Sequence, residues 1–153
     1  MQIALYQPDI PQNTGTILRL AACFGVTAHI IEPAGFPVTD AAFRRAGMDY
    51  LDRVQIVRHI SWPVFADWRR ASGARLLLFT TAASERHIDA AYRPDDILLF
   101  GRESAGVPEA VHQAADRRLT IPMRPGLRSL NVAVAVAMAL GEALRQTDGF
   151  PRD

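Results

Sequence analysis

Short apolar runs, separated by segments with helical signals, constrain the fold of this chain most strongly. The runs lie at residues 3–6, 28–31, 54–57, 76–80, 97–100 and 119–121. Most carry apolar residues at successive positions, which is typical of strands covered on both faces. The resulting β-α-β order predicts an α/β fold, with a single parallel sheet and helices on both of its faces.

The segments between the runs carry residues that begin and end helices. Side chains that cap a helix N-terminus are followed at helical distance by glycines that end one. The predicted pairs of cap and stop are Asn13 or Thr14 with Gly25 (helix to residue 24), Asp40 with Gly47 (helix to residue 46), and Ser61 with Gly73. Pro63 falls in the first turn of the third helix, where proline is favourable.

The segment 130–146 admits two readings, because residues 132–137 alternate valine with alanine as a strand could. We predict a helix, since the segment is too long for an ordinary strand and either Ser129 or Asn131 can cap it. Its larger side chains also share one face at four-residue spacing, and these are Val132, Val136, Leu140 and Leu144.

Length and composition favour one folded unit. A chain of 153 residues with 49% hydrophobic and 22% charged residues suits a single domain over residues 1–153. The lone Cys23 cannot form an internal disulfide, no export signal opens the chain, and no apolar segment approaches the ~20 residues of a membrane span. We expect a cytoplasmic protein with no membrane association.

The basic residues number seventeen and all are arginine. This excludes lysine chemistry, including Schiff bases and the P-loop lysine. A net charge of +1 does not by itself indicate a nucleic-acid binder, so RNA contacts would have to come from local arginine clusters. The candidates are Arg44 with Arg45, Arg69 with Arg70, Arg117 with Arg118, and Arg124 with Arg128, although solvated surface charge explains Arg69 and Arg70 better.

Three loops that follow strands carry unusual residues, and ligands of open α/β sheets bind at such loops. The first, residues 6–15, has prolines at 8 and 11 and leads into a helix that places Arg19 one turn in. The second, residues 100–109, opens a buried strand into Gly101, Arg102, Glu103 and a further glycine. The third, residues 121–131, ends in Ser129 and Asn131 at the mouth of the last helix.

Each loop alone also has an ordinary structural explanation, as a capped helix start or a glycine turn. Two common chemistries are excluded. No serine lies in a G-x-S-x-G elbow, which argues against a Ser-His-Asp hydrolase. The four histidines form no metal-ligand spacing, so no metal is expected.

Together the three loops resemble the SPOUT superfamily of knotted RNA methyltransferases, and within it the TrmL (YibK) family of tRNA wobble-nucleotide 2′-O-methyltransferases. The resemblance covers nearly the whole chain, through residues 5–15, 30–33, 44–50, 100–103, 121–123 and 129–131. It implies S-adenosylmethionine as cofactor and S-adenosylhomocysteine as product, tRNA as substrate, and a homodimer whose subunits complete the RNA site. It also implies a C-terminal trefoil knot within about residues 75–146.

The resemblance also implies roles for individual residues. The cofactor pocket would use Phe79, Gly101, Ile121 and Ser129. The polar positions around the methyl-transfer site would be Asn13, Arg19, Glu103 and Asn131, with Ser129 beside them. RNA phosphates would meet Arg44, Arg45, Arg124 and Arg128.

The ribose 2′-hydroxyl must lose its proton as it attacks the methyl carbon. A guanidinium normally stays protonated, so we expect Arg19 to clamp phosphate and developing alkoxide, while Glu103 or a substrate phosphate receives the proton. The chain departs from the family pattern at Ala105, where many relatives carry a basic residue, and at Ala133, where many carry serine. The alternatives are a related methyltransferase acting on rRNA or another tRNA position, and a non-catalytic RNA-binding relative.

Overall fold

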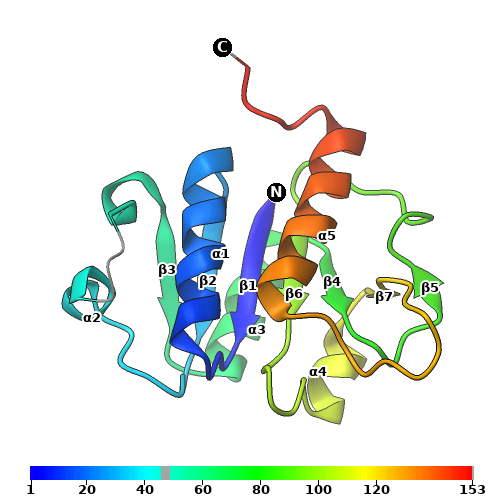
Figure 1. The fold of residues 1–153 in the computed structure, drawn as a ribbon, viewed down its shortest axis with the longest axis horizontal. Coiled ribbons are helices and arrows are strands. Elements are labelled where there is room, and N and C mark those ends of the chain that lie inside the picture. Colours follow the sequence, from blue (N-terminus) through cyan, green and yellow to red (C-terminus); the bar gives the residue numbers. More distant parts are fainter. Residues whose placement is uncertain (46–48, 153) are drawn as a thin grey trace.

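A computed structural model describes residues 1–45 and 49–152 and shows one parallel sheet between two layers of helices (Figure 1). The strands are β1 (Gln2–Tyr6), β2 (Thr27–Ile31), β3 (Ile56–His59), β4 (Leu76–Phe79), β5 (Glu85–Arg86), β6 (Ile97–Phe100) and β7 (Arg117–Thr120). The helices are α1 (Pro11–Phe24), α2 (Asp40–Arg45), α3 (Trp62–Ser72), α4 (Glu109–Ala114) and α5 (Val132–Thr147), with a 3-10 turn η1 (Leu51–Arg53). The predicted α/β fold is confirmed.

The strand order β3-β2-β1-β6-β4-β7-β5 places the first strand beside the sixth. All recorded strand pairs are parallel, and Leu5 of β1 lies opposite Phe100 of β6. β2 and β3 lie on one side of β1, and the later strands β4 to β7 lie on its other side. The loops after β1 and β6 therefore leave neighbouring strands at the point where the strand order reverses, where ligands of such sheets bind.

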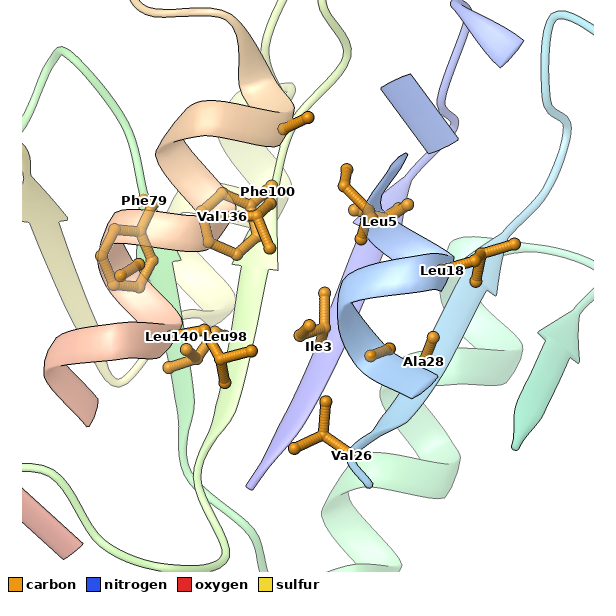
Figure 2. Close-up of a cluster of buried hydrophobic side chains, with 14 of the residues drawn as sticks. Ile3, Leu5, Leu18, Val26, Ala28, Phe79, Leu98, Phe100, Val136 and Leu140 are labelled. Atoms are coloured by element: carbon orange, nitrogen blue, oxygen red, sulfur yellow. The ribbon is translucent and has the colours of Figure 1, made fainter. Parts of the chain in front are cut away.

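Alternate residues of the central strands feed two separate cores. Ile3, Leu98 and Phe100 face one layer, and Ala4 and Leu99 face the other. The first core is covered by α1 and α5, whose side chains meet the sheet in Figure 2. The second is covered by α3 and α4, through Phe65 and Val111 respectively. Full burial on both faces explains why the strand sequences are apolar at successive positions.

The last helix follows its prediction closely. The Asn131 side chain caps α5 by accepting hydrogen bonds from the backbone N–H groups of Ala133 (2.8 Å) and Val134 (3.3 Å). Val136, Leu140 and Leu144 are buried on the shared face. Ser61 likewise caps α3, and Gly73 ends it in the left-handed conformation.

Two predicted caps are wrong. The first helix begins at Pro11, two residues before the predicted capping position, and neither Asn13 nor Thr14 caps it, because both lie inside its first turn. The cap of α2 is Thr39, whose Oγ1 accepts from the Ala42 N–H at 3.1 Å, while Asp40 is the first helical residue. The predicted stop at Gly47 lies outside the described residues.

Strand positions differ from the predictions at three places. β3 lies two residues later than the apolar run at 54–57, and β7 begins two residues earlier than the run at 119–121. The two-residue strand β5 was not predicted, since Glu85 and Arg86 carry no strand pattern. β5 pairs with β7 at the sheet edge, where Glu85 forms an ion pair with Arg117.

Candidate active site

A cavity of about 620 Å³ opens at the carboxyl ends of β4, β6 and β7. This volume lies within the range of small-molecule sites. All three loops singled out in the sequence contribute to its wall, although they lie up to about 120 residues apart. The predicted site residues that line it are Asn13, Phe79, Gly101, Glu103, Ile121, Arg128, Ser129 and Asn131.

Part of the cavity wall is apolar. Ile121, Leu130 and Val132 contribute to its wall, and the rings of Phe79 and Phe100 stack with centroids 4.9 Å apart. Phe79 and Phe100 also appear in Figure 2, at the ends of their strands beneath α5. These side chains offer the kind of surface on which a heterocyclic base can lie.

The loop after β6 turns back on itself at two glycines. Arg102 and Gly106 exchange two backbone hydrogen bonds of 2.9 Å. A Cβ at Gly101 would lie 2.7 Å from the backbone carbon of Gly106, and Gly106 itself has a φ of +63°. Both positions therefore require glycine, and the tight turn projects Glu103 back toward the loop after β1.

The loops after β1 and β6 are joined by reciprocal hydrogen bonds between Asp9 and Glu103. The Asp9 backbone N–H donates to Glu103 Oε2 at 3.0 Å, and the Glu103 N–H donates to Asp9 Oδ1 at 3.2 Å. The Ser104 hydroxyl also donates to Asp9, and Arg102 Nε lies 3.8 Å from Asp9 Oδ2. A third loop presses on the same point, because a Cβ at Gly35 would lie 2.9 Å from Asp9 Cα.

Two asparagines extend this network to the last helix. Asn13 Nδ2 lies 3.5 Å from Glu103 Oε1 as a donor, and Asn131 Nδ2 donates to Asn13 Oδ1 at 2.9 Å. Asn13 therefore points into the network instead of capping its own helix. Glu103, Asn13 and Asn131 form a continuous polar edge of the cavity.

The two carboxyl groups differ in proton affinity. The Glu103 side chain and then the Ser104 hydroxyl stabilise the ionised form of Asp9 and lower its pKa to about 2. Partial burial, and then the adjacent Asp9 carboxylate, raise the pKa of Glu103 above its usual value. A carboxyl group with raised pKa at a cavity edge is suited to accept a proton during a reaction.

The structure does not bring all predicted residues to the cavity. Arg19 lies on the exposed side of α1, where its guanidinium carbon is 4.7 Å from the ring centroid of Tyr50 and its Nη2 donates to the Tyr50 hydroxyl at 3.4 Å. Arg44 is exposed and pairs with Asp52 at 2.7 Å. Arg45 and Arg124 are exposed, and neither contributes to the described wall of the cavity.

Sequence reasoning missed Asp9, the residue with the most contacts between the loops. Its only local signal is a position between two prolines, and its partners lie more than 90 residues away. Over residues 1–45 and 49–152, no group of three or more His, Cys, Asp or Glu side chains is placed to hold a metal ion. Within that same part of the chain, every helix is too short or too polar to cross a membrane.

Comparison with known proteins decides the family. Residues 1–141 match the SpoU rRNA Methylase family. The chain belongs to this family. The SpoU match covers all three loops and ends within α5, and the resemblance drawn from the motifs is confirmed.

Relatives and solved structures of the SpoU methylase kind agree with this assignment. A protein of Beijerinckia indica subsp. indica named tRNA (cytidine(34)-2'-O)-methyltransferase is 67% identical over 98% of this chain and 94% of its own. A structure described for the 2-OH methylation of C/U34 on tRNA matches with a TM-score of 0.88 and 42% identity, over 95% of this chain and 94% of that one.

A third SpoU methyltransferase, AviRb from Streptomyces viridochromogenes, was solved in complex with the cofactor AdoMet. It matches with a TM-score of 0.84 and 30% identity, over 95% of this chain and 57% of that chain. The present chain therefore matches somewhat more than half of that longer chain.

Proposed function

We propose that this protein transfers a methyl group from S-adenosylmethionine to the ribose 2′-hydroxyl of the wobble nucleotide, C34 or U34, in the tRNA anticodon loop. The observation that carries the proposal is the cavity where the three loops meet, in which Glu103, Asn13 and Asn131 form a polar edge and apolar side chains contribute to the wall. The names of full-length relatives at 39–67% identity support the nucleotide.

The residues of the cavity fit S-adenosylmethionine, with S-adenosylhomocysteine as the product. Adenine would lie among Phe79, Ile121 and Val132, while Gly101 and Ser129 would bind through their backbone and hydroxyl groups. When bound, the cofactor supplies an electrophilic methyl group next to the polar edge. The absence of a side chain at Gly101 keeps the loop after β6 tight at this position.

The polar edge would bind the ribose and manage its proton. Asn13 and Asn131 would orient the hydroxyl through their amide groups, and Glu103 or a substrate phosphate would accept the proton as the oxygen attacks. The raised pKa of Glu103 favours this assignment. Arg19 would contact phosphate and the developing negative charge, since its guanidinium stays protonated.

Arg19 does not line the cavity of its own subunit, so a contact with bound RNA would have to be made at a second subunit. We propose a homodimer in which Arg19 meets RNA bound at the partner's cavity. Val134 and Met138 lie four residues apart on α5 and are 48% and 44% exposed, and Leu130 continues this exposed apolar face. A Met138→Glu variant that sediments as a monomer and loses tRNA methylation would support the dimer; a wild-type protein that is monomeric at assay concentration would contradict it.

The family resemblance also supports proposals for the RNA contacts, the knot and the cellular location of this protein. Arg44, Arg45, Arg124 and Arg128 would bind tRNA phosphates, and three of them are exposed outside the cavity while Arg128 lies on its wall. Residues 1–153 would act as one domain, with a trefoil knot within about residues 75–146. The protein would act in the cytoplasm, where its tRNA substrate is found.

The function is tested with an unmodified tRNA transcript, purified protein and S-adenosylmethionine. Mass spectrometry of the digested RNA should detect one 2′-O-methyl group at position 34, and a matched transcript with 2′-deoxycytidine at position 34 should remain unmodified. Methylation of rRNA or of another tRNA position instead would contradict the wobble assignment. Lack of S-adenosylmethionine binding in a titration would contradict an enzyme altogether.

The role of Arg19 is tested separately with the Arg19→Ala variant. We expect the variant to lose turnover while its affinity for S-adenosylmethionine stays close to that of the wild type, because Arg19 is not part of the described cavity wall. Unchanged turnover in the purified variant would refute the assignment.

A further inference from the structure

Asp9 occupies the junction of three loops beside the cavity, yet it has no place in the chemistry proposed above. It exchanges backbone and side-chain hydrogen bonds with Glu103, accepts from Ser104 and pairs with Arg102. Its side chain is only 17% exposed. The close approach of Gly35 to Asp9 Cα fixes the backbone at this point from the other side.

This junction holds two carboxyl groups together in a site that is partly shielded from water. The Asp9 carboxylate is stabilised by the Ser104 hydroxyl, the Glu103 N–H and the Arg102 guanidinium, whereas Glu103 accepts from the Asp9 N–H and from the neutral Asn13 amide. The negative charge is therefore better satisfied on Asp9. Two carboxylates at close range cannot both ionise freely, so the added proton of the pair goes to Glu103.

The other charged or titratable groups on the described wall do not change which carboxyl group takes the added proton. His112 faces the cavity from α4, and Arg128 faces it from the loop before α5. Neither has a recorded hydrogen bond or ion pair with Asp9 or Glu103 in the described part of the chain. Arg102 is the cation that touches the pair, and it does so through Asp9.

We propose that Asp9 is a positioning residue for the methyl-transfer reaction: it fixes the Glu103 carboxyl group at the cavity edge and, as a neighbouring negative charge, makes Glu103 the stronger proton acceptor. This inference rests on the proposed function. As the 2′-oxygen forms its bond to the methyl carbon and the sulfonium bond to that carbon breaks, the hydroxyl proton passes to Glu103. Asp9 stays ionised throughout and exchanges no proton.

The test is the pH dependence of kcat/KM for tRNA at saturating S-adenosylmethionine, which reports the ionisation of the enzyme–cofactor complex before tRNA binds. In the wild type the rate should rise with pH as Glu103 loses its proton. The Asp9→Asn variant keeps the backbone donor and an acceptor oxygen but removes the charge. We expect its acidic limb to move to lower pH by about one unit.

A second variant gives the opposite prediction and guards against misfolding of the first. Arg102→Gln removes the cation beside the pair, so the pair binds its proton more tightly and the acidic limb should move to higher pH. Asp67→Asn is the matched control, since Asp67 pairs with Arg70 on exposed α3, and it should leave the limb in place.

An acidic limb that stays in place in Asp9→Asn, in a variant with wild-type thermal stability, would overturn the inference. An acidic limb in Arg102→Gln that is unmoved or moves to lower pH would overturn it as well. A wild-type protein that transfers no methyl group to position 34 would instead overturn the proposed function, and an acidic limb that persists in Glu103→Gln would overturn Glu103 as the proton acceptor.

Discussion

The carboxyl pair at the cavity edge differs from a second pair of like titratable side chains, which lies inside the second core. Asp9 and Glu103 are partly exposed, and their partners come from loops. His29 of β2 and His59 of β3 are 1% and 4% exposed, and they lie between the sheet and α3 with His29 Nδ1 2.9 Å from His59 Nε2. Each pair links two neighbouring strands or the loops that follow them, but the hydrogen bonds to the two pairs come from different kinds of group.

The histidine pair is complete in its neutral form. His29 Nε2 lies 2.6 Å from Gln2 Oε1, and because that oxygen only accepts, Nε2 must carry the proton. His29 Nδ1 then accepts from His59 Nε2. Burial, and then the neighbouring His59, lower the pKa of His29 to about 4. The centroid of the His29 ring lies 4.5 Å from the ring centroid of Trp68. A buried pair with lowered pKa values that lies outside the cavity wall stabilises the fold.

The carboxyl pair retains one acceptor with raised proton affinity at the edge of an open cavity. Its hydrogen bonds come from backbone and hydroxyl donors that favour charge on Asp9 and leave the added proton to Glu103. Proximity of like groups therefore does not by itself mark a reactive site. Access and unequal stabilisation of the two groups distinguish the functional pair from the structural one.

The largest effect should come from Glu103→Gln. The variant keeps the shape of the side chain but removes the proton acceptor, so we expect turnover at position 34 to fall by roughly 10²- to 10⁴-fold. The free energy of unfolding should change little, because the site is partly exposed. Methylation rates and urea unfolding measured on the same preparation check both, and a fully active variant would place the proton elsewhere.

The histidine pair should behave in the reverse way. We expect His29→Ala to reduce the free energy of unfolding by about 4 kcal/mol, because it leaves a cavity beside Trp68 and deprives Gln2 and His59 of their buried partner. The folded fraction should keep its methylation rate within about threefold. A stable but inactive variant would show that the two regions are not separate in function.

The pH dependence of stability should reveal the histidines in the wild type. The folded pKa of His29 is lower than the unfolded value of about 6.5, so the unfolded state binds more protons as the pH falls. The contribution is fully present above about pH 6.5 and is lost toward pH 4. We expect the loss to reach about 2 kcal/mol at pH 5 and about 3 kcal/mol at pH 4, measured by urea unfolding.

The control for this pH effect is His29→Ala, whose unfolding free energy should depend less steeply on pH between 6.5 and 4 than that of the wild type. Equal slopes in the two proteins would mean that His29 is protonated in the folded state.

The smallest effect should come from neutralising an exposed charge. Asp67→Asn removes an ion pair with Arg70 whose side chains are 74% and 67% exposed. We expect less than about 0.5 kcal/mol in unfolding free energy and no change in methylation rate. A larger change in either measurement would show that simple charge neutralisation contributes to the effects at the two pairs.

The sheet and the main helices were predictable because their signals are local. Continuous apolar runs identify strands that are covered on both faces, and Ser61, Gly73 and Asn131 act on their own helix ends. Where the prediction failed, the deciding partner lies elsewhere. β3 extends to His59 because that residue pairs with Ile31 of β2, and β5 forms through its pairing with β7.

The residues of the site likewise divide into those with local sequence signals and those whose partners are remote. The three loops were recognisable from their prolines, glycines and polar residues, and the structure gathers them into one cavity. Asp9 could not be found in this way, because its importance comes from Glu103, which lies 94 residues later. The local sequence around Asn13 predicts a helix cap for the same reason, since its partners Glu103 and Asn131 are remote, and only the family resemblance places Asn13 at the site.

The hydrogen bond between Asn131 and Asn13 spans 118 residues of chain. During synthesis at roughly 5–20 residues per second, the first loop must wait several seconds before the ribosome delivers its last partner. The polar edge of the cavity can therefore form only after Asn131 has emerged from the ribosome, and a nascent chain lacks this edge until then.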